Sequence, residues 1–377
     1  MKIFYIANAR IPTEKANGIA ILKACESLAR AGASVRLILP RRRASSAEVF
    51  DRYGIQKNFD IVRLPTLDLY GYVPNLLAFY LQTATFYSAA KLWLLFRSRA
   101  SIIYTRDVWP LFFAWLGYRV VYECHHLSGY RNLHFFAARR AAYIVTISQA
   151  LKHIFVSAGF DEKKILVAPS GVDLSIFDIN ISKEDARKEL DLPQEARIAL
   201  YTGNFTTMGA DKGIADIIKA LKDAPDVMFV AVGGGEGDMA LYGEQAKNAG
   251  IEQRVILRGY APQTKLAIYQ KAADVLLMPF PDTPHYRNHM SPVKMFEYMA
   301  SDRPIIASDL PTIREVLNES NAILVPPNNP AQIARALTAL ASSSKGQEIA
   351  QKAREQAHQF SWNERAKKIL DTLRAKI

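Results

Sequence analysis

The chain has 377 residues, half of them hydrophobic, and a formal net charge of +12 at pH 7. At about 100–200 residues per domain, this length predicts two domains. Only two cysteines are present, which excludes a disulfide framework and a cysteine-rich zinc site, and no apolar run is long and uncharged enough to span a bilayer. The amino terminus lacks the apolar core of a signal peptide and is interpreted as a first β-strand. We therefore expect a protein of a reducing compartment.

The first half of the chain alternates short apolar runs with helical patterns. Such runs are typical of parallel strands that are covered on both faces. The predicted strands are Lys2–Ala7, Ser34–Leu39, Ile61–Leu64, Ser101–Tyr104, Arg119–Tyr122, Tyr143–Ile147 and Ile165–Val167. The predicted helices are Gly18–Arg30, Pro74–Arg97 and Gln149–Ala158.

The predicted helix Pro74–Arg97 is apolar on nearly all sides. Between Leu76 and Phe96 its one formal charge is Lys91. A helix of this composition is usually buried between a sheet and its neighbours, and burial is the preferred interpretation. The alternative is that it lies on a bilayer through its aromatic side.

The second half repeats the alternation. Its predicted strands are Arg197–Tyr201, Val227–Val232, Val255–Leu257, Val275–Met278, Pro304–Ala307 and Ala322–Val325, and its helices include Ile214–Lys222, Gln263–Lys271, Val293–Met299 and Pro330–Ala341. Between the halves, Ser175–Pro193 is polar and broken, as expected of a linker. Two such blocks predict two doubly wound α/β domains. In such folds ligands bind beyond the carboxyl ends of the strands, and we expect them in the cleft between the domains.

Several loops carry residues suited to a phosphate. Gly18 is expected at a helix start, where free N–H groups favour an anion. Gly203-Asn204 follows a strand, Lys212 would stand near a helix amino end, where its charge can neutralise a diphosphate, and Gly233–Gly237 lets a ligand or a neighbouring backbone come close. Taken singly, each also fits an ordinary turn or a surface lysine. The sequence has no G-x-G-x-x-G, which argues against a nicotinamide or flavin dinucleotide enzyme.

The segment His289–Ala300 concentrates the signals of a binding site. Ser291 is expected as a helix N-cap and Pro292 in the first turn. Lys294 and Glu297 are three residues apart and therefore share one helical face. Free N–H groups with Lys294 suit a diphosphate, and a carboxylate one turn later suits the hydroxyls of a ribose. The structural alternative is a capped helix with one ion pair, but a position after a strand end favours function.

These segments resemble family 4 of the retaining glycosyltransferases, which have the GT-B fold. Glu297–Ala300 matches the E-Y-M-A run of that family, and Arg303–Ser308 matches the following G-x-P-[VI]-[VI]-A-S. Ser291–Glu297 reproduces the S-P-x-K-x-x-E of a subgroup. Further matches, in the expected order, are Tyr122–His125, Ile147-Ser148, Pro169–Asp173 with Phe177, Gly203, Lys212-Gly213, Gly233–Gly235 and Arg258–Tyr260.

The resemblance implies two Rossmann-like domains that face each other across a cleft. The acceptor-side domain would be residues 1–174 and the nucleotide-sugar-binding domain 175–360, and a C-terminal helix of about residues 361–377 would pack back on the first. It implies a hexosyltransferase of EC 2.4 type, which moves a sugar from a nucleotide-diphosphate donor to an acceptor with retention at the anomeric carbon. No D-x-D motif lies at a strand end, so no obligatory metal and no other cofactor is expected.

The resemblance also assigns roles to residues. The catalytic residues would be His125 near the transferred sugar, with His126 as the alternative, Lys212 against the charge of the leaving diphosphate, and Glu297 on the ribose hydroxyls. The donor would be held by Gly18, Gly203, Asn204, Lys212, Gly234, Tyr260, His289, Ser291, Pro292, Val293, Lys294 and Glu297.

Two positions depart from the pattern of the family. His289 stands where the family has the first of two spaced glutamates, which contacts the hydroxyls of the donor sugar. Asn204 stands where many members have an arginine for the diphosphate. Lys212 and Lys294 would then balance the leaving charge.

The excess positive charge lies in the first half. Residues 1–174 carry 23 Lys and Arg against 11 Asp and Glu, whereas residues 175–377 carry 25 of each. A basic surface with aromatic residues suits an anionic membrane, an anionic lipid or a nucleic acid. The alternative is a solvated basic face with the aromatic residues in the core.

The aromatic residues from Tyr70 to Tyr122 are close in sequence to Arg97 and Arg99, and the run Arg41–Arg43 is a further source of charge. We therefore expect a peripheral protein of the cytoplasm, on the inner face of the plasma membrane. Its acceptor would be lipid-linked or amphiphilic, in polysaccharide or glycan biosynthesis.

Other functions fit parts of the sequence. A nucleotide-sugar epimerase shares the fold, whereas a phosphorylase of this fold would need a pyridoxal lysine and a longer chain. The charge of +12 would suit a nucleic-acid-binding module, but no helix-turn-helix, zinc finger or RNP pattern supports one.

Overall fold

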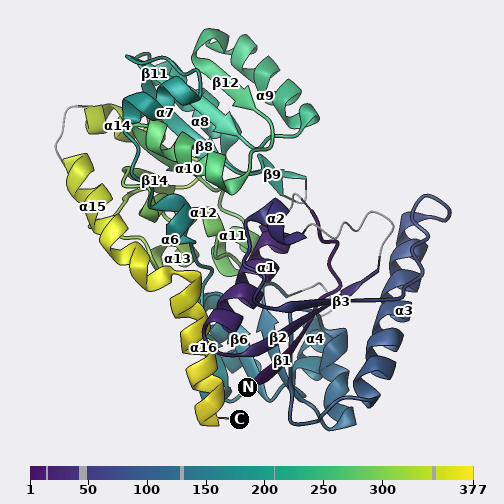
Figure 1. Cartoon of the computed structure of the whole chain (residues 1–377). Coiled ribbons are helices and arrows are strands. Elements are labelled where there is room, and N and C mark those ends of the chain that lie inside the picture. The colour runs from purple at the N-terminus through teal and green to yellow at the C-terminus, as the bar shows by residue number, and fades with distance from the viewer. Residues whose placement is uncertain (14–15, 42–48, 128–130, 208, 342–344, 377) are drawn as a thin grey trace. The chain divides into compact units, whose positions relative to one another are not determined.

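In a computed structural model, which describes residues 1–13, 16–41, 49–127, 131–207, 209–341 and 345–376, the chain divides into two compact units (Figure 1). Unit 1 comprises residues 1–169 and the chain from Trp362 onward, and unit 2 comprises residues 170–361. Each unit is built on a parallel sheet covered by helices, so the prediction of two doubly wound α/β domains is confirmed.

The sheet of unit 1 has seven parallel strands in the order β3-β2-β1-β4-β5-β6-β7. The strands are β1 (Lys2–Ile6), β2 (Ser34–Pro40), β3 (Asp60–Leu64), β4 (Ile102–Thr105), β5 (Arg119–Cys124), β6 (Tyr143–Thr146) and β7 (Ile165–Val167). Most of their side chains are buried, as apolar runs covered on both faces require. The strand order reverses between β1 and β4, and ligands of such sheets bind at the carboxyl ends near this reversal.

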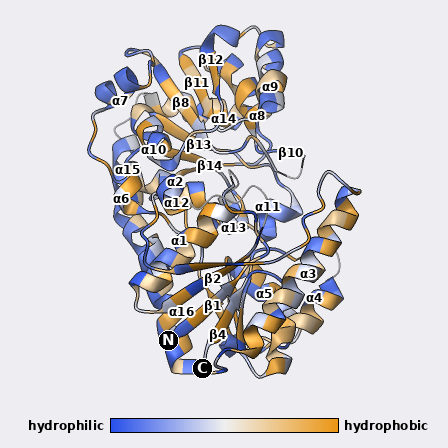
Figure 2. Ribbon diagram, turned by 45° about the vertical axis from the view of Figure 1, so that its right-hand side comes forward, coloured by the Kyte–Doolittle hydropathy of each residue, from blue (hydrophilic) through white to orange (hydrophobic). Residues whose placement is uncertain are grey.

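Two helical layers cover this sheet, each with its own apolar core. One layer contains α1 (Ala16–Arg30), α2 (Val49–Tyr53) and α16 (Trp362–Lys376). The other contains α3 (Asn75–Leu95), the 3-10 helix η1 (Trp109–Leu116), α4 (Arg131–Ala138) and α5 (Gln149–Ser157), and a short 3-10 turn, η2 (Glu162–Lys164), precedes β7. The last helix of the chain, α16, packs against α1. Figure 2 shows the hydrophobic strands between these layers.

The sheet of unit 2 has six parallel strands in the order β12-β11-β8-β13-β14-β15, so its order reverses between β8 and β13. The strands are β8 (Arg197–Thr202), β11 (Val227–Val232), β12 (Val255–Arg258), β13 (Val275–Met278), β14 (Ile305–Ser308) and β15 (Ile323–Val325), and β9 (Thr206–Thr207) and β10 (Ala210–Asp211) pair as a small antiparallel hairpin. The helices are α6 (Leu174–Phe177), α7 (Lys183–Glu189), α8 (Ile214–Ala220), α9 (Glu236–Asn248), α10 (Gln263–Ala272), α11 (Pro284–Asn288), α12 (Val293–Ala300), α13 (Pro311–Arg314), α14 (Pro330–Ala341) and α15 (Lys345–Ala357), with 3-10 turns η3 (Leu221–Asp223), η4 (Glu252–Arg254) and η5 (His358–Phe360).

The prediction that Ser175–Pro193 is a linker is wrong. Its residues form most of α6 and all of α7, which belong to the core of unit 2. Arg187 is 2% exposed, and its guanidinium donates from Nη2 to Asp274 (2.7 Å) and from Nε to the carbonyl of Ala272 (2.9 Å). Most charged side chains of α7 are exposed and the buried guanidinium of Arg187 is paired, so the polar composition of this segment does not mean a lack of structure.

Two helix starts also differ from the prediction. Helix α1 begins before Gly18, which is buried within it, and a Cβ atom on Gly18 would overlap the methyl group of Thr13. Close packing therefore requires this glycine. Helix α12 begins at Val293, because Pro292 has the extended ψ of 125° and acts as the N-cap without a side-chain bond. The hydroxyl of Ser291 does not cap the helix and instead accepts the N–H of Ser170 (2.9 Å).

Helix α3 is buried on one side and exposed on the other. Phe86, Ala90 and Leu94 face the core of the sheet, whereas Leu77 and Tyr80 are exposed. The preferred interpretation of full burial is therefore right for one side only. None of the described helices is both long and apolar enough to cross a membrane.

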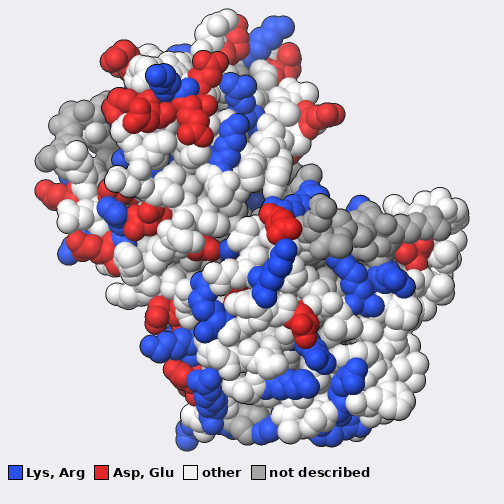
Figure 3. All heavy atoms as spheres, viewed as in Figure 1, with Lys and Arg blue, Asp and Glu red and all other residues white. Residues whose placement is uncertain are grey.

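The two units differ in charge more than the two halves of the sequence do. Unit 1 gains the basic helix α16, so it carries 28 Lys and Arg against 12 Asp and Glu, a net charge of +16. Unit 2 carries 20 against 24, a net charge of −4. Figure 3 shows the basic side chains on unit 1 and the mixed charges on unit 2.

Candidate functional site

Most of the predicted donor-binding residues lie at the carboxyl edge of the sheet in unit 2. Gly203 and Asn204 follow β8, Gly234 follows β11, and Tyr260 follows β12. The segment from His289 into α12 comes after β13, the strand that adjoins β8 at the reversal. The fold therefore gathers residues from four loops at the edge where doubly wound sheets bind ligands.

Lys294 is a buried cation at this edge. Its Nζ lies 3.4 Å from the centroid of the Tyr201 ring and 3.3 Å from the place that a Cβ atom on Gly203 would take. The φ of Gly203 is +103°, so a side chain there would be strained as well as crowded. No described residue offers Nζ a hydrogen-bond partner. Burial, with the charge of Lys212 as the next cause, holds the pKa of Lys294 well below its usual value.

Lys212 reaches the same edge from the hairpin β9–β10. The preceding residue, Asp211, accepts the N–H groups of Gly213 (2.7 Å) and Ile214 (3.1 Å) and so fixes the start of α8. Gly213 has a φ of +97°, and a Cβ atom there would overlap the carbonyl oxygen of Pro279. Burial lowers the pKa of Lys212 to about 8. The local turn therefore holds a second ammonium group in a partly desolvated position.

Glu297 lies one turn after Lys294 and is 6% exposed. Burial raises its pKa to about 7. Nε2 of Gln263 on α10 donates to Oε1 of Glu297 (3.2 Å) and orients this carboxyl group. Gln263 was not singled out from the sequence, because only the packing of α10 against the site reveals it.

The other glycines of this edge are explained by packing between neighbouring loops. A Cβ atom on Gly234 would overlap the ring of Phe205, and one on Gly233 would lie 2.8 Å from the backbone of Gly203. The loop Gly233–Gly237 was expected to let either a ligand or a neighbouring backbone come close, and the structure shows the close approach of neighbouring residues. Asn204 and Tyr260 are exposed, and the N–H of His289 donates to the carbonyl of His285 (2.9 Å).

In unit 1, His125 follows β5 and is held by a buried carboxylate. Its Nε2 donates to Oε1 of Glu123 (2.6 Å), which leaves Nδ1 as the acceptor of the neutral ring. Burial, with the charge of Arg106 as the next cause, lowers the pKa of His125 to about 4, so the ring is neutral at pH 7. His126 is exposed and has no such anchor. Of the two histidines, His125 is therefore the one with a fixed orientation.

Glu123 is completely buried and binds two arginines. Arg106 lies 2.8 Å from Oε1, and Arg365 of α16 lies 3.0 Å from Oε2. The hydroxyl of Tyr104 donates to the same carboxylate. Burial alone would raise the pKa of Glu123, but the two guanidinium charges outweigh it and hold the pKa well below its usual value. Glu123 is a charged residue within the apolar run of β5, and this is the sequence signal that could have indicated the cluster. Nothing in the sequence points to Arg365.

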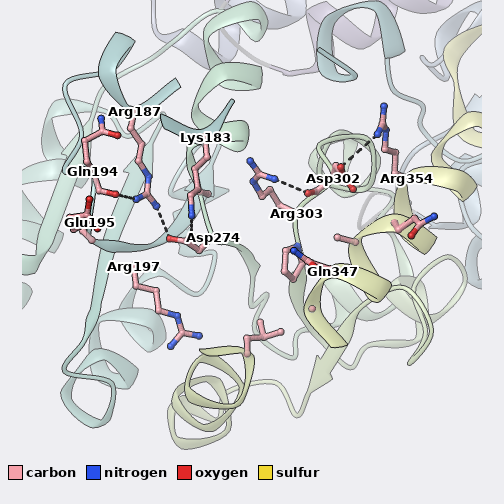
Figure 4. Close-up of a pocket in the computed structure, with 17 residues that line it drawn as sticks. Lys183, Arg187, Gln194, Glu195, Arg197, Asp274, Asp302, Arg303, Gln347 and Arg354 are labelled. Carbon is pink, nitrogen blue, oxygen red and sulfur yellow. Dashed lines mark hydrogen bonds and ion pairs between the residues drawn. The ribbon is translucent and has the colours of Figure 1, made fainter. Parts of the chain in front are cut away.

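A cavity of about 870 Å³ in unit 2 lies at the opposite edge of the sheet, near the starts of β8, β13 and β14. Figure 4 shows Lys183 and Arg187 converging on Asp274, at distances of 3.0 and 2.7 Å. Asp274 also accepts the N–H of Ile198 (2.7 Å). These polar groups satisfy one another and attach α7 to the sheet, so we assign the candidate site to the carboxyl edge.

Two family models match the chain. Glycosyl transferases group 1 matches residues 196–343, and Glycosyltransferase Family 4 matches residues 18–176. A putative teichuronic acid biosynthesis glycosyltransferase, TuaC from Bacillus subtilis, is 28% identical over 204 residues, which are 54% of this chain and 47% of that protein. The chain thus spans about half the length of the curated relatives it matches.

Solved structures match over nearly the whole chain. Sucrose-phosphate synthase from Thermosynechococcus elongatus has a TM-score of 0.79 at 21% identity and covers 99% of this chain and 98% of its own. HepE from Anabaena, solved in complex with UDP-glucose, has a TM-score of 0.76 at 19% identity and covers both chains completely. An epimerase and a nucleic-acid-binding module are not favoured by these matches. The two family models match successive parts of the chain, and the structure has two doubly wound units. The chain therefore belongs to family 4 of the glycosyltransferases and has the GT-B fold.

Proposed function

We propose that the protein transfers a sugar from a nucleotide-diphosphate sugar to a lipid-linked or amphiphilic acceptor, with retention at the anomeric carbon. The buried ammonium of Lys294, close to Lys212 and one turn before Glu297, carries this proposal. A buried ammonium without a partner is unfavourable until an anion joins it. A diphosphate supplies that anion. The UDP-glucose complex of HepE supports a donor of this class.

The charges at this edge suit departure of a nucleoside diphosphate. As the bond between the anomeric carbon and the diphosphate breaks, negative charge grows on the leaving group, and preplaced positive charge lowers the barrier. We assign this role to Lys212 and Lys294. We assign the binding of the ribose hydroxyls to Glu297. The remaining donor contacts are those expected from the sequence. His125, whose Nδ1 is an acceptor, is assigned a contact with a hydroxyl of the sugar or the acceptor.

We propose that the leaving charge is balanced by these lysines without an obligatory metal. Among the described residues, no three His, Cys, Asp or Glu side chains gather as metal ligands would. Equal turnover with EDTA and with added Mg²⁺ is the result expected of this arrangement.

The acceptor is assigned from the charge of unit 1. With +16 on this unit, we propose that the protein works in the cytoplasm, as a peripheral protein at the anionic inner face of the plasma membrane. A lipid-linked acceptor in glycan biosynthesis would be reached there. Of the basic run Arg41–Arg43, Arg42 and Arg43 lie outside the described residues.

A panel of nucleotide sugars tests the proposal. A donor that binds the folded protein raises its melting temperature, so one donor or a few related donors should do so. The same donor should be consumed when a polyprenyl-phosphate-linked sugar is added, and NMR of the product should show the anomeric configuration of the donor. A panel in which no nucleotide sugar raises the melting temperature or is turned over would contradict it.

Glu297→Gln is expected to weaken donor binding about tenfold or more, because a charged hydrogen bond contributes about 1.5–3 kcal/mol. The change keeps the shape of the side chain, so the fold should persist. Calorimetric titration with the donor measures the effect. Glu252→Gln, at an exposed carboxylate of the same unit, is the control and should bind as the wild type does. Equal affinities of the two variants would remove Glu297 from the site.

Donor binding at pH 8.5 is expected to take up protons. In the free protein the pKa of Lys212 is about 8, so this side chain is partly neutral at pH 8.5, and burial also lowers the pKa of Lys294. A bound diphosphate raises both pKa values, and affinity should fall as the pH rises above 8. Calorimetry with UDP in buffers of different ionisation enthalpy measures the uptake. Lys212→Met should reduce it, and identical enthalpies in all buffers would refute the assignment.

A further inference from the structure

The exposed apolar side chains are concentrated in one part of unit 1. Of the 17 large apolar side chains that are exposed in the described part of the chain, 14 lie between Leu67 and Phe136. Soluble surfaces rarely gather apolar groups in this way unless the patch meets a partner. The range covers α3, η1 and α4, which belong to the same helical layer.

Helix α3 presents the longest stretch of this surface. Because α-helical positions recur every 3.6 residues, Leu77, Tyr80, Leu92 and Leu95 share the side opposite the buried Phe86. The exposed fractions of Tyr80 and Leu92 are 59% and 60%. The exposed side carries one charge, Lys91, whose long stem can lie along apolar surface while its ammonium stays in water. The helix is coloured as hydrophobic along most of its length in Figure 2.

Exposed tryptophans and arginines adjoin this helix. Trp109 and Trp115 of η1 are 56% and 70% exposed. The guanidinium of Arg140 lies 4.7 Å from the ring centroid of Trp115 and 4.0 Å from that of Phe136, which joins η1 to α4. At the end of α3, the guanidinium of Arg97 lies 4.7 Å from the ring of Trp93. Side chains with an apolar body and a polar tip are those that settle at the boundary between lipid and water.

The charge of this surface has one sign. Between residues 65 and 140 the chain has eight Lys and Arg and three Asp and Glu. None of the three acids is exposed: Asp68 and Asp107 are partly buried and Glu123 is completely buried. Lys91, Arg97, Arg99, Arg119, Arg131 and Arg139 are all exposed. Within residues 65–140 an anionic partner would therefore meet attractive charge and no exposed carboxylate.

We infer that the outer face of α3, with the exposed side chains of η1 and α4 beside it, docks onto the surface of an anionic phospholipid bilayer. The apolar side chains enter the boundary of the acyl chains, and the surrounding arginines contact lipid phosphates. A second copy of this surface would bring the same positive charges together, which opposes self-association. The inference rests on the proposed function in one respect, since a lipid-linked acceptor requires the enzyme to work at a membrane.

Co-sedimentation with vesicles tests the docking face. The full-length protein should sediment with vesicles that contain equal parts of phosphatidylglycerol and phosphatidylcholine, less with phosphatidylcholine alone, and less as salt is added. A variant with Leu77→Glu, Leu92→Glu and Leu95→Glu should bind at least tenfold more weakly, because three exposed apolar groups become anionic. Leu241→Glu on α9, at a residue that is 52% exposed, is the matched control and should sediment as the wild type does.

Tryptophan fluorescence locates the contact. Brominated lipids in the anionic vesicles should quench the emission of the wild type, and Trp109→Phe with Trp115→Phe should remove most of that quenching. The assignment of the docking face is refuted if the wild type stays in the supernatant at low salt, or if the triple variant and the Leu241→Glu control sediment alike. A wild type that is dimeric in solution and a triple variant that is monomeric would assign the face to a second copy instead.

The same samples separate this inference from the proposed function. If a nucleotide sugar raises the melting temperature of the protein but the protein does not bind vesicles, the proposed donor site is supported and the proposed docking face is refuted. Vesicle binding with no response to any nucleotide sugar would support the docking face and refute the donor site. The leucine variants lie outside the donor site, so their response to the donor without vesicles should equal that of the wild type.

Discussion

Lys212→Ala is expected to lower kcat about a hundredfold or more while the KM for the donor changes much less. An electrostatic group aimed at a developing charge is typically worth about 10²–10³ in rate when it is removed. Lys212 is held by the turn from Asp211 to Gly213 and is already desolvated in the free protein. Little reorganisation is then needed when charge appears on the leaving diphosphate. Steady-state kinetics with the donor identified by the panel measures both constants.

Lys219→Ala is the matched control for this prediction. Lys219 lies on α8, the helix that follows Lys212, and its side chain is 65% exposed with an i,i+3 partner in Asp216. Exposed pairs of this kind contribute little, so the control should keep the kcat of the wild type. An alanine variant of Lys212 with wild-type kcat and a raised KM would make Lys212 a binding residue and overturn its role in bond breaking.

Arg365→Met is expected to lower the free energy of unfolding of unit 1 by about 3–5 kcal/mol, the usual cost of leaving a buried charge without its partner. Glu123 would keep Arg106 but lose the guanidinium at Oε2. The pKa of Glu123 should then rise, and the loss of stability should be larger at the higher pH, because the carboxylate that has lost its partner is ionised there. Thermal unfolding at pH 5 and pH 8 measures both effects.

Arg374→Met on the same helix is the control for the stability effect. The side chain of Arg374 is 50% exposed and pairs with Asp371 at 3.3 Å, also on the surface. Its removal should change the melting temperature little. Equal losses in the two variants would mean that helix α16 itself, and not the buried carboxylate, responds to the substitution.

The strands were predictable because each is a short apolar run between helical patterns. β7, β11 and β13 were predicted with their observed bounds, and the other predicted strands differ by one or two residues at one or both ends. The segment Ser175–Pro193 was misinterpreted because the burial of Arg187 depends on Asp274, which is distant in sequence. Composition reports polarity but not whether a polar group will find a buried partner.

The candidate site was predictable in its residues but not in their surroundings. The spacing of Lys294 and Glu297 indicated a common helical face, and the structure places both at the carboxyl edge of the sheet. The desolvation of Lys294 depends on Tyr201 and Gly203, which reach it from β8 and the loop that follows. For α3, the apolar pattern had no polar side, so periodicity could not distinguish the buried face from the exposed one.

The membership of α16 in unit 1 has a consequence for the order in which the protein folds during synthesis. Residues 170–361 of unit 2 are contiguous, so this unit can complete its core as soon as it has left the ribosome. The first 169 residues emerge earlier but lack Ile369, Leu370 and Leu373 of their core and Arg365 of the buried cluster. Until the last residues are made, Glu123 has no second guanidinium partner and α1 has no covering helix. The domain translated first is therefore the one completed last, and a nascent chain stopped before Trp362 should present unit 1 to chaperones.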